Sequence, residues 1–173
     1  MDLVKDARGG REAAFLQLFD AHHLPLFRFA YRLTGSAEDA EDIVQECFLE
    51  LLRPGCSYDP DRTPIRTYLF GVVRNQAFKR LRRGGASDRT ISEESPEPSP
   101  ESRALSTETA DIVARAVAGL PDTQREVLIL AHYEEMPLAE IAQVLEIEVT
   151  AVKSRLQRAR AQLKERLAVY ERP

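Results

Sequence analysis

The segment LAEIAQVLEIEVTAVKSRLQRARAQLKE, which spans Leu138–Glu165, contains two helical apolar patterns separated by a polar turn. The shorter pattern follows Pro137, a residue that suits the first turn of a helix, and consists of Leu138, Ile141, Ala142 and Leu145. The longer pattern follows the turn at Glu146–Glu148, consists of Val152, Leu156 and Leu163, and continues to Leu167, two residues beyond the segment. Because the small side chain of Ala142 lets two helices cross closely, the segment predicts a helix-turn-helix.

The longer of these two helices is basic on its outer side. Between Val149 and Arg166 the sequence has six basic residues and one acidic residue. Four polar side chains near the N-terminal half face outward, where they can reach base edges in a DNA major groove: Lys153, Ser154, Gln157 and Arg158. Three further cations suit phosphates: Arg155, Arg160 and Lys164. The alternative is a solvated basic face on an ordinary helical bundle.

Helical periodicity also runs through the rest of the chain. After Ser36, which is expected to cap a helix, apolar residues recur at i, i+3, i+4 and i+7: Ala40, Ile43, Val44, Cys47, Phe48, Leu51 and Leu52. A helix over Phe15–Leu33 is expected to break or kink at Pro25, and others open at Pro64 and Pro121. No alternating strand pattern of useful length is present, so the predicted fold class is all-α.

The weakest segment for folding is GGASDRTISEESPEPSPESR, residues Gly84–Arg103. Ten of its 20 residues are Ser, Pro or Gly, and Ile91 is its one large apolar side chain. Such a segment buries too little surface to offset its chain entropy. We therefore predict a flexible, mildly acidic linker at residues 84–104, between two small helical domains at 1–83 and 105–173.

Charge is sorted along the chain, although its net value is only −4. Glu38–Glu50 has six acidic residues and no basic one, whereas Arg62–Arg83 has seven basic residues and no acidic one. Because exposed charges are screened beyond about 8–10 Å at cellular salt, a partner responds to the local patch. Four side chains opposite the apolar stripe can bind a basic protein: Asp39, Asp42, Gln45 and Glu46. A solvated acidic face is the alternative.

Aromatic residues are interleaved with the cations of Arg62–Arg83, a combination that suits single-stranded nucleic acid. Tyr68 can stack on an unpaired base and Asn75 can read a base edge. The cations available to hold the backbone include Arg62, Lys79 and Arg80. The alternative is that Phe70 and Phe78 belong to the hydrophobic core.

The composition argues against several other classes of protein. No stretch approaches 18 consecutive apolar residues, which excludes a membrane-spanning helix, and the N-terminal residues do not form a secretory signal. Cys47 and Cys56 are too few for a disulfide-stapled secreted fold, so we expect a soluble cytoplasmic protein with two inert thiols; a regulatory disulfide is the alternative. Neither a metal site nor a cofactor is expected, since His22-His23 and His132 lack companion ligands at metal-binding spacing.

The order of these pieces resembles the extracytoplasmic-function (ECF) sigma factors of bacterial RNA polymerase, over nearly the whole chain. DAEDIVQECFLELL (Asp39–Leu52) is similar to the family's polymerase-binding helix. RTYLFGVVRNQAFKRLRR (Arg66–Arg83) is similar to the part that melts and reads the minus-ten element. LPDTQREVLIL (Leu120–Leu130) and the segment Leu138–Glu165 resemble the part that reads the minus-thirty-five element.

The resemblance implies a role for each candidate site residue. Asp39, Asp42, Gln45 and Glu46 match the contact with the basic clamp helices of core RNA polymerase. Asn75 and the loop Asp59–Ile65 match the part that captures a flipped minus-ten base. Lys153, Ser154, Gln157 and Arg158 match the major-groove readers. Tyr68 stands where the family usually has Trp, and Glu146 where it usually has Gly.

The resemblance also implies a non-enzymatic promoter-specificity subunit and an anti-sigma protein that holds it inactive and can tether it to the membrane. Two rival hypotheses stay open. A stand-alone helix-turn-helix regulator would bind duplex DNA without polymerase, but it leaves the acidic helix and Asn75 without a role. A redox or metal enzyme would depend on Cys47, Cys56 and the His22-His23 pair.

Overall fold

The computed structural model describes residues 2–84 and 103–171, with side chains given from residue 108 onward in the second range. The chain divides into two compact units, residues 1–90 (unit 1) and 91–173 (unit 2). The linker predicted at 84–104 lies, apart from its ends, outside the described residues. All regular structure in the described ranges is helical, which confirms the predicted all-α class.

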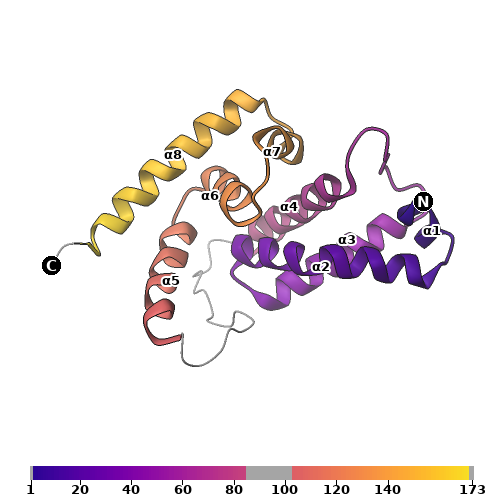
Figure 1. Cartoon of the computed structure of the whole chain (residues 1–173), viewed down its shortest axis with the longest axis horizontal. Coiled ribbons are helices and arrows are strands. Elements are labelled where there is room, and N and C mark those ends of the chain that lie inside the picture. Colours follow the sequence, from indigo (N-terminus) through magenta and orange to yellow (C-terminus); the bar gives the residue numbers. More distant parts are fainter. Residues whose placement is uncertain (1, 85–102, 172–173) are drawn as a thin grey trace. The chain divides into compact units, whose positions relative to one another are not determined.

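Unit 1 is built from four helices: α1 (Leu3–Arg8), α2 (Glu12–Thr34), α3 (Ala37–Leu52) and α4 (Ile65–Arg83). Helix α2 packs along α1, α3 and α4, and α3 packs on α4 (Figure 1). The core includes Phe29 and Phe70, whose ring centroids lie 5.2 Å apart, so Phe70 is a core residue. Burying one large apolar side chain contributes about 2–3 kcal/mol, and α3 buries its whole predicted apolar stripe except Leu52, which is half-buried.

Local sequence explains where these helices begin and end. Ser36 Oγ accepts a hydrogen bond from the Asp39 amide at 3.1 Å, which confirms the predicted N-cap of α3. Helix α2 continues through Pro25, so of the predicted break or kink the break is wrong. The cost of the missing amide is offset by the buried side chains that flank it, Leu26 and Phe29 among them. Helix α1 was not predicted; the Arg8 guanidinium fixes it to α3 by donating from Nε to the Leu51 carbonyl at 2.9 Å.

Unit 2 contains α5 (Arg103–Ala118), α6 (Asp122–Leu128), a π-helical turn η1 (Ile129–Tyr133), α7 (Leu138–Leu145) and α8 (Val149–Ala168). Helix α8 packs against α5, α6 and α7 (Figure 1). Its buried residues are Val152, Leu156 and Ala159, and Ile141 and Ala142 face the core from α7. Helices α7 and α8 and the turn between them form the predicted helix-turn-helix.

The turn between α7 and α8 holds Glu146 in the left-handed region, with φ 54° and ψ 43°. The Ile147 amide donates to the Ala142 carbonyl at 3.0 Å, which closes the C-terminus of α7. A side chain with a Cβ is strained in this conformation, whereas glycine adopts it at little cost.

Replacing Glu146 with glycine is therefore expected to stabilise unit 2 by about 0.5–1 kcal/mol, because it removes the left-handed strain. Urea unfolding of the full chain, followed by circular dichroism, measures the change. The matched control is Gln143→Gly, an exposed position inside α7, where glycine should instead destabilise by about 0.5–1 kcal/mol. Equal effects of the two substitutions would contradict the strain argument.

Candidate protein-docking and nucleic-acid interfaces

The outer side of α3 presents the acidic face, defined here as Asp39, Asp42, Gln45 and Glu46. Asp42, Gln45 and Glu46 are exposed and Asp39 is half-buried at one edge. The apolar stripe of α3 points the opposite way into unit 1, so burial of that stripe fixes the direction of the acidic face. The structure thus brings together all four residues predicted to bind a protein partner.

Leu49 adds an apolar side chain to this face and was missed by the sequence analysis. It lies one helical turn beyond Gln45 and Glu46, and it is 65% exposed, in contrast to its buried neighbour Phe48. Its position outside the apolar stripe of α3 is the signal from which the exposure of Leu49 could have been predicted. A partner that docks on these carboxylates could bury Leu49 at the same time and so add apolar contact to the charge pairing.

Arg80 lies against the acidic face. Its guanidinium approaches three carboxylates: Nη1 lies 3.1 Å from Asp39 Oδ1 and 3.6 Å from Asp42 Oδ2, and Nη2 lies 3.5 Å from Glu46 Oε1. The sequence pattern groups Arg80 with the other cations of α4 that are predicted to bind DNA. In the free chain it is instead paired across the interface of α3 and α4.

The remaining predicted residues of α4 share a different face. Tyr68, Asn75 and Lys79 are separated by seven and four residues, so they lie along one side of the helix, with Asn75 and Lys79 exposed. Arg80 follows Lys79 directly, and each residue of an α-helix is rotated by about 100° from the one before it. Arg80 therefore lies off this side of α4 and toward α3. We call Tyr68, Asn75 and Lys79 the α4 face. Phe78 stays half-buried, with the Arg74 guanidinium 5.0 Å from its ring centroid.

Tyr68 is held by the loop that precedes α4. Its hydroxyl lies 3.2 Å from Cys56 Sγ, and its ring centroid lies 5.0 Å from that of Tyr58. Burial, together with the Cys56 thiol, raises the pKa of Tyr68, so the phenol loses its proton less readily than an exposed tyrosine does. Tyr58 is a second aromatic at this site that sequence reasoning missed. Arg62, in the same loop, is highly exposed, and its Nε lies 3.8 Å from Asp59 Oδ2.

The two cysteines occupy different environments. Cys47 is buried and its Sγ donates to the Leu69 carbonyl at 3.7 Å, whereas Cys56 is partly exposed. Both are free thiols in the structure. Burial, with smaller contributions from Glu50 and Cys56, raises the pKa of Cys47 to about 12. Because the thiolate is the reactive form, Cys47 stays an unreactive thiol until pH approaches that value.

Native protein treated with iodoacetamide at about pH 8 is therefore expected to take one label, at Cys56, while the urea-unfolded chain takes two. Intact-mass spectrometry and peptide mapping make the measurement. The variant Cys56→Ser controls for slow labelling of Cys47 and should take no label when native. Rapid labelling of Cys47 in that variant would contradict its burial.

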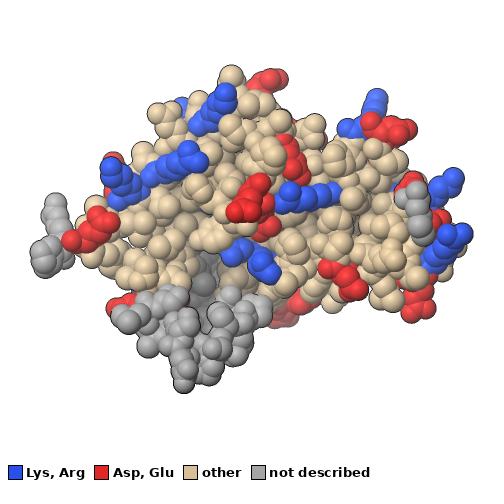
Figure 2. All heavy atoms as spheres, viewed as in Figure 1, with Lys and Arg blue, Asp and Glu red and all other residues tan. Residues whose placement is uncertain are grey.

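The four predicted major-groove readers of α8 are all exposed. Lys153, Ser154, Gln157 and Arg158 follow an i, i+1, i+4, i+5 pattern on the side of α8 that faces away from its buried residues. Figure 2 shows Lys and Arg side chains following the course of α8 along the edge of unit 2. The second helix of a helix-turn-helix presents this part of its surface to base edges.

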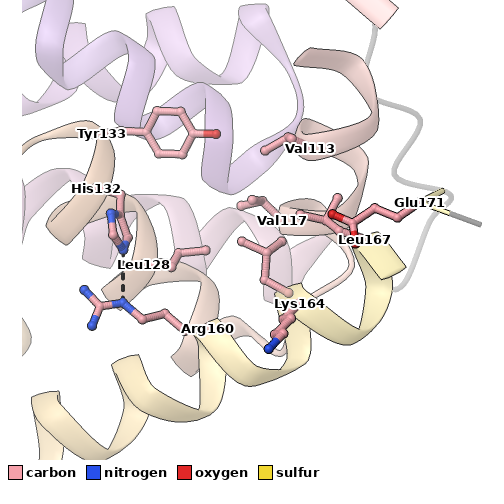
Figure 3. A pocket seen from close by; sticks show the side chains of 10 residues that line it. Val113, Val117, Leu128, His132, Tyr133, Arg160, Lys164, Leu167 and Glu171 are labelled. Atoms are coloured by element: carbon pink, nitrogen blue, oxygen red, sulfur yellow. Dashed lines mark hydrogen bonds between the residues drawn. The ribbon is translucent and has the colours of Figure 1, made fainter. Parts of the chain in front are cut away.

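Two other cations of α8 are bound within unit 2. Arg155 Nη1 lies 3.3 Å from Oε1 of Glu126, a fully buried carboxylate of α6. Arg160 Nε donates to His132 Nε2 at 3.2 Å (Figure 3). The sequence pattern predicts phosphate contacts for both, and this stays a prediction; in the free chain their side chains connect the helix to α6 and η1. Lys164 is exposed.

An apolar pocket of about 430 Å³ lies between α5, the α6–η1 segment and α8 (Figure 3). Val113, Val117, Leu128 and Leu167 supply its apolar wall, and Tyr133, which is 40% exposed, stands at its rim.

Among the residues that the structure describes, no group of three or more His, Cys, Asp or Glu residues is arranged to hold a metal ion. None of the described helices is long and apolar enough to cross a membrane.

Two models of protein families match the chain. Sigma-70 region 2 matches residues 18–86, and Sigma-70, region 4 matches residues 110–163. Among solved structures, CnrH of Cupriavidus metallidurans, in complex with the cytosolic domain of CnrY, gives a TM-score of 0.74 with 31% identity over 96% of each chain. RpoE of Bartonella quintana, in complex with the anti-sigma factor NepR, gives 0.69 with 25% identity over 90% of this chain and 97% of that one.

Two relatives of similar sequence are described as ECF RNA polymerase sigma factors. SigW of Bacillus subtilis, an ECF RNA polymerase sigma factor, is 28% identical over 177 residues, 95% of this chain and 94% of that protein. The ECF RNA polymerase sigma factor SigM of Mycobacterium tuberculosis is 35% identical over 154 residues, 89% of this chain and 77% of its own. The acidic face falls within the first matched region and the readers of α8 within the second. The chain belongs to the ECF RNA polymerase sigma factors.

Proposed function

We propose that this chain recruits core RNA polymerase to specific promoters and helps open the DNA, with no catalytic chemistry of its own. The observation that carries the proposal is the separation of three exposed surfaces on two compact units. Unit 1 bears the acidic face and the α4 face, and unit 2 bears the basic readers of α8. The similarity of the chain to ECF RNA polymerase sigma factors supports this function.

The acidic face suits docking on basic helices of the polymerase. Asp42 and Glu46 are about half exposed and can pair with arginine or lysine, and Leu49 offers an apolar contact beside them. Complementary charge of this kind steers association and fixes orientation. DNA would be repelled by the same carboxylates, so this surface is assigned to protein.

The α4 face and Arg62 suit the minus-ten element. Opening a duplex requires that a base leave the stack, which costs a few kcal/mol. Tyr68 and Tyr58 offer rings for stacking, and Asn75 can hydrogen-bond a flipped base. Lys79 and Arg62, both exposed, can hold the phosphates on either side.

Lys153, Ser154, Gln157 and Arg158 suit the major groove of the minus-thirty-five element. A flexible connection at 84–104 between domains at 1–83 and 105–173 would let the two readers span separate promoter elements. Gln157 can pair with adenine, and Lys153 or Arg158 with guanine. This arrangement assigns base recognition to unit 2 and strand opening to unit 1.

Reconstitution with core RNA polymerase tests the function. We expect promoter-dependent transcripts from a subset of genomic fragments, and sequencing of the DNA bound by the holoenzyme should yield two elements a fixed distance apart. The control is Asp42→Lys, which reverses charge on the acidic face and should abolish these transcripts together with polymerase binding. Tight duplex binding without any polymerase binding would favour a stand-alone regulator instead.

We also propose that an anti-sigma protein regulates this chain in the cytoplasm, and that a membrane-bound anti-sigma protein would hold it at the membrane. CnrH was solved with CnrY, and RpoE with the anti-sigma factor NepR. Both structures match at least 90% of this chain.

A further inference from the structure

The ion pairs of Arg80 connect two surfaces that the proposed function assigns to different partners. Arg80 belongs to the cationic last turn of α4, where Arg82 and Arg83 are exposed, as is Lys79 just before it. Its own side chain is only 27% exposed, and its guanidinium lies within 4 Å of three carboxylates of α3. One residue of the cationic helix is therefore held on the acidic face.

Arg80 partly neutralises the acidic face in the free chain. Asp39, Asp42 and Glu46 carry three negative charges, and the planar guanidinium fork can share its donors among them. The carboxylates are 43–52% exposed, so water screens each pair and no single one is strong. Such pairs can be exchanged for those of an incoming cation.

A cationic protein that docks on Asp42 and Glu46 competes with Arg80 for the same oxygens. Once displaced, the guanidinium belongs to the helix that carries Asn75 and Lys79, about 100° around the helix from the α4 face. A long, flexible arginine side chain released there can reach a phosphate of bound DNA. Docking of polymerase on the acidic face thus frees a cation of α4 for the bound DNA.

We propose that Arg80 is an exchangeable counter-ion that couples polymerase docking to the grip on promoter DNA. In the free chain it pairs with the acidic face, and in the holoenzyme it turns to the DNA backbone. The inference rests on the proposed function and adds an energetic link between its two surfaces. Because such coupling is reciprocal, bound DNA must strengthen polymerase binding by the same factor.

The test measures the affinity of the full chain for core RNA polymerase, with and without a minus-ten fork-junction DNA. Arg80→Gln removes the internal competitor, so it should bind polymerase about three- to tenfold more tightly than the wild type in the absence of DNA. The factor by which the DNA strengthens polymerase binding should fall in the same variant. The gain in polymerase affinity and the fall in the effect of DNA should both become smaller as the salt concentration is raised.

Arg28→Gln is the matched control, since it removes one exposed positive charge from α2 of the same unit. It should gain much less affinity than Arg80→Gln, because it leaves the acidic face unchanged. Arg80→Lys keeps the charge but loses the fork, and should lie between the wild type and Arg80→Gln.

Polymerase binding by Arg80→Gln that is equal to or weaker than that of the wild type would overturn the proposal, because Arg80 would then only support the carboxylates. An unchanged coupling factor would overturn it as well. If Arg80→Gln fails to fold, the same two measurements on Arg80→Lys support or overturn the proposal by the same criteria. Complete failure of the wild-type chain to bind polymerase would instead reject the proposed function.

Discussion

Replacing Lys153 with glutamate is expected to abolish binding of the upstream promoter element while leaving the affinity for core RNA polymerase within about twofold of wild type. Lys153 is exposed near the start of α8, on the side that carries Ser154, Gln157 and Arg158. The substitution removes a cation and places an anion against phosphates and base edges. We expect a loss of at least 100-fold in affinity for the upstream duplex, which corresponds to about 2.7 kcal/mol.

Fluorescence anisotropy with a labelled upstream duplex, at fixed ionic strength, measures this loss, and a separate titration measures polymerase binding. Arg158→Glu should behave in the same way, because it lies five residues further along the exposed side of α8, one helical turn beyond Ser154. Lys5→Glu in α1 makes the same change in net charge at an exposed site in unit 1 and serves as the control. An equal fall in polymerase affinity for Lys153→Glu would contradict the division of labour between the units.

The sequence was sufficient for those parts of the fold that depend on local patterns. Ser36, the apolar stripe of α3 and the helix-turn-helix of α7 and α8 were all predicted, because caps and periodicity are written within single helices. The exposed readers of α8 followed from the same periodicity, since burial of Val152, Leu156 and Ala159 determines which side chains face outward.

The partners of individual charges could not be predicted in this way. Arg80 and Arg155 lie at the edges between the buried and exposed sides of their helices, where periodicity does not assign them. Which carboxylate each one meets depends on how α4 crosses α3, and α8 crosses α6, and that is a property of the packed unit. The path of α2 through Pro25 was missed for a related reason, because tertiary packing outweighs a local helix-breaking preference.

Glu126 is the clearest case of a charge whose burial local sequence patterns do not reveal. It is 0% exposed beneath α8, next to Arg125, which is 1% exposed and donates to Ala118 O at 2.9 Å and to Asp122 Oδ1 at 2.6 Å. From α8, Arg155 Nη1 lies 3.3 Å from Glu126 Oε1. A buried carboxylate of this kind is stabilised by a paired guanidinium, because charge in a low-dielectric interior is unfavourable without compensation.

Arg155→Met is therefore expected to destabilise unit 2 by about 3 kcal/mol, since it removes a guanidinium that pairs with the buried Glu126 carboxylate. Small domains are only marginally stable, so a loss of this size should unfold much of unit 2 at about 37 °C and abolish binding of the upstream duplex. Unit 1 should keep its affinity for polymerase. Urea unfolding of the full chain, followed by amide exchange in each unit, separates the two effects.

The double variant Glu126→Met/Arg155→Met distinguishes support of the fold from contact with DNA. Replacing both partners by apolar side chains of similar size should restore stability to within about 1 kcal/mol of wild type. If Arg155 acts only by holding α8 on α6, upstream binding returns along with stability. A stable double variant that still binds DNA weakly would show that Arg155 also contacts phosphate. Equal stability of the wild type and Arg155→Met would refute the need for this pair, because Glu126 would then tolerate burial without the Arg155 guanidinium.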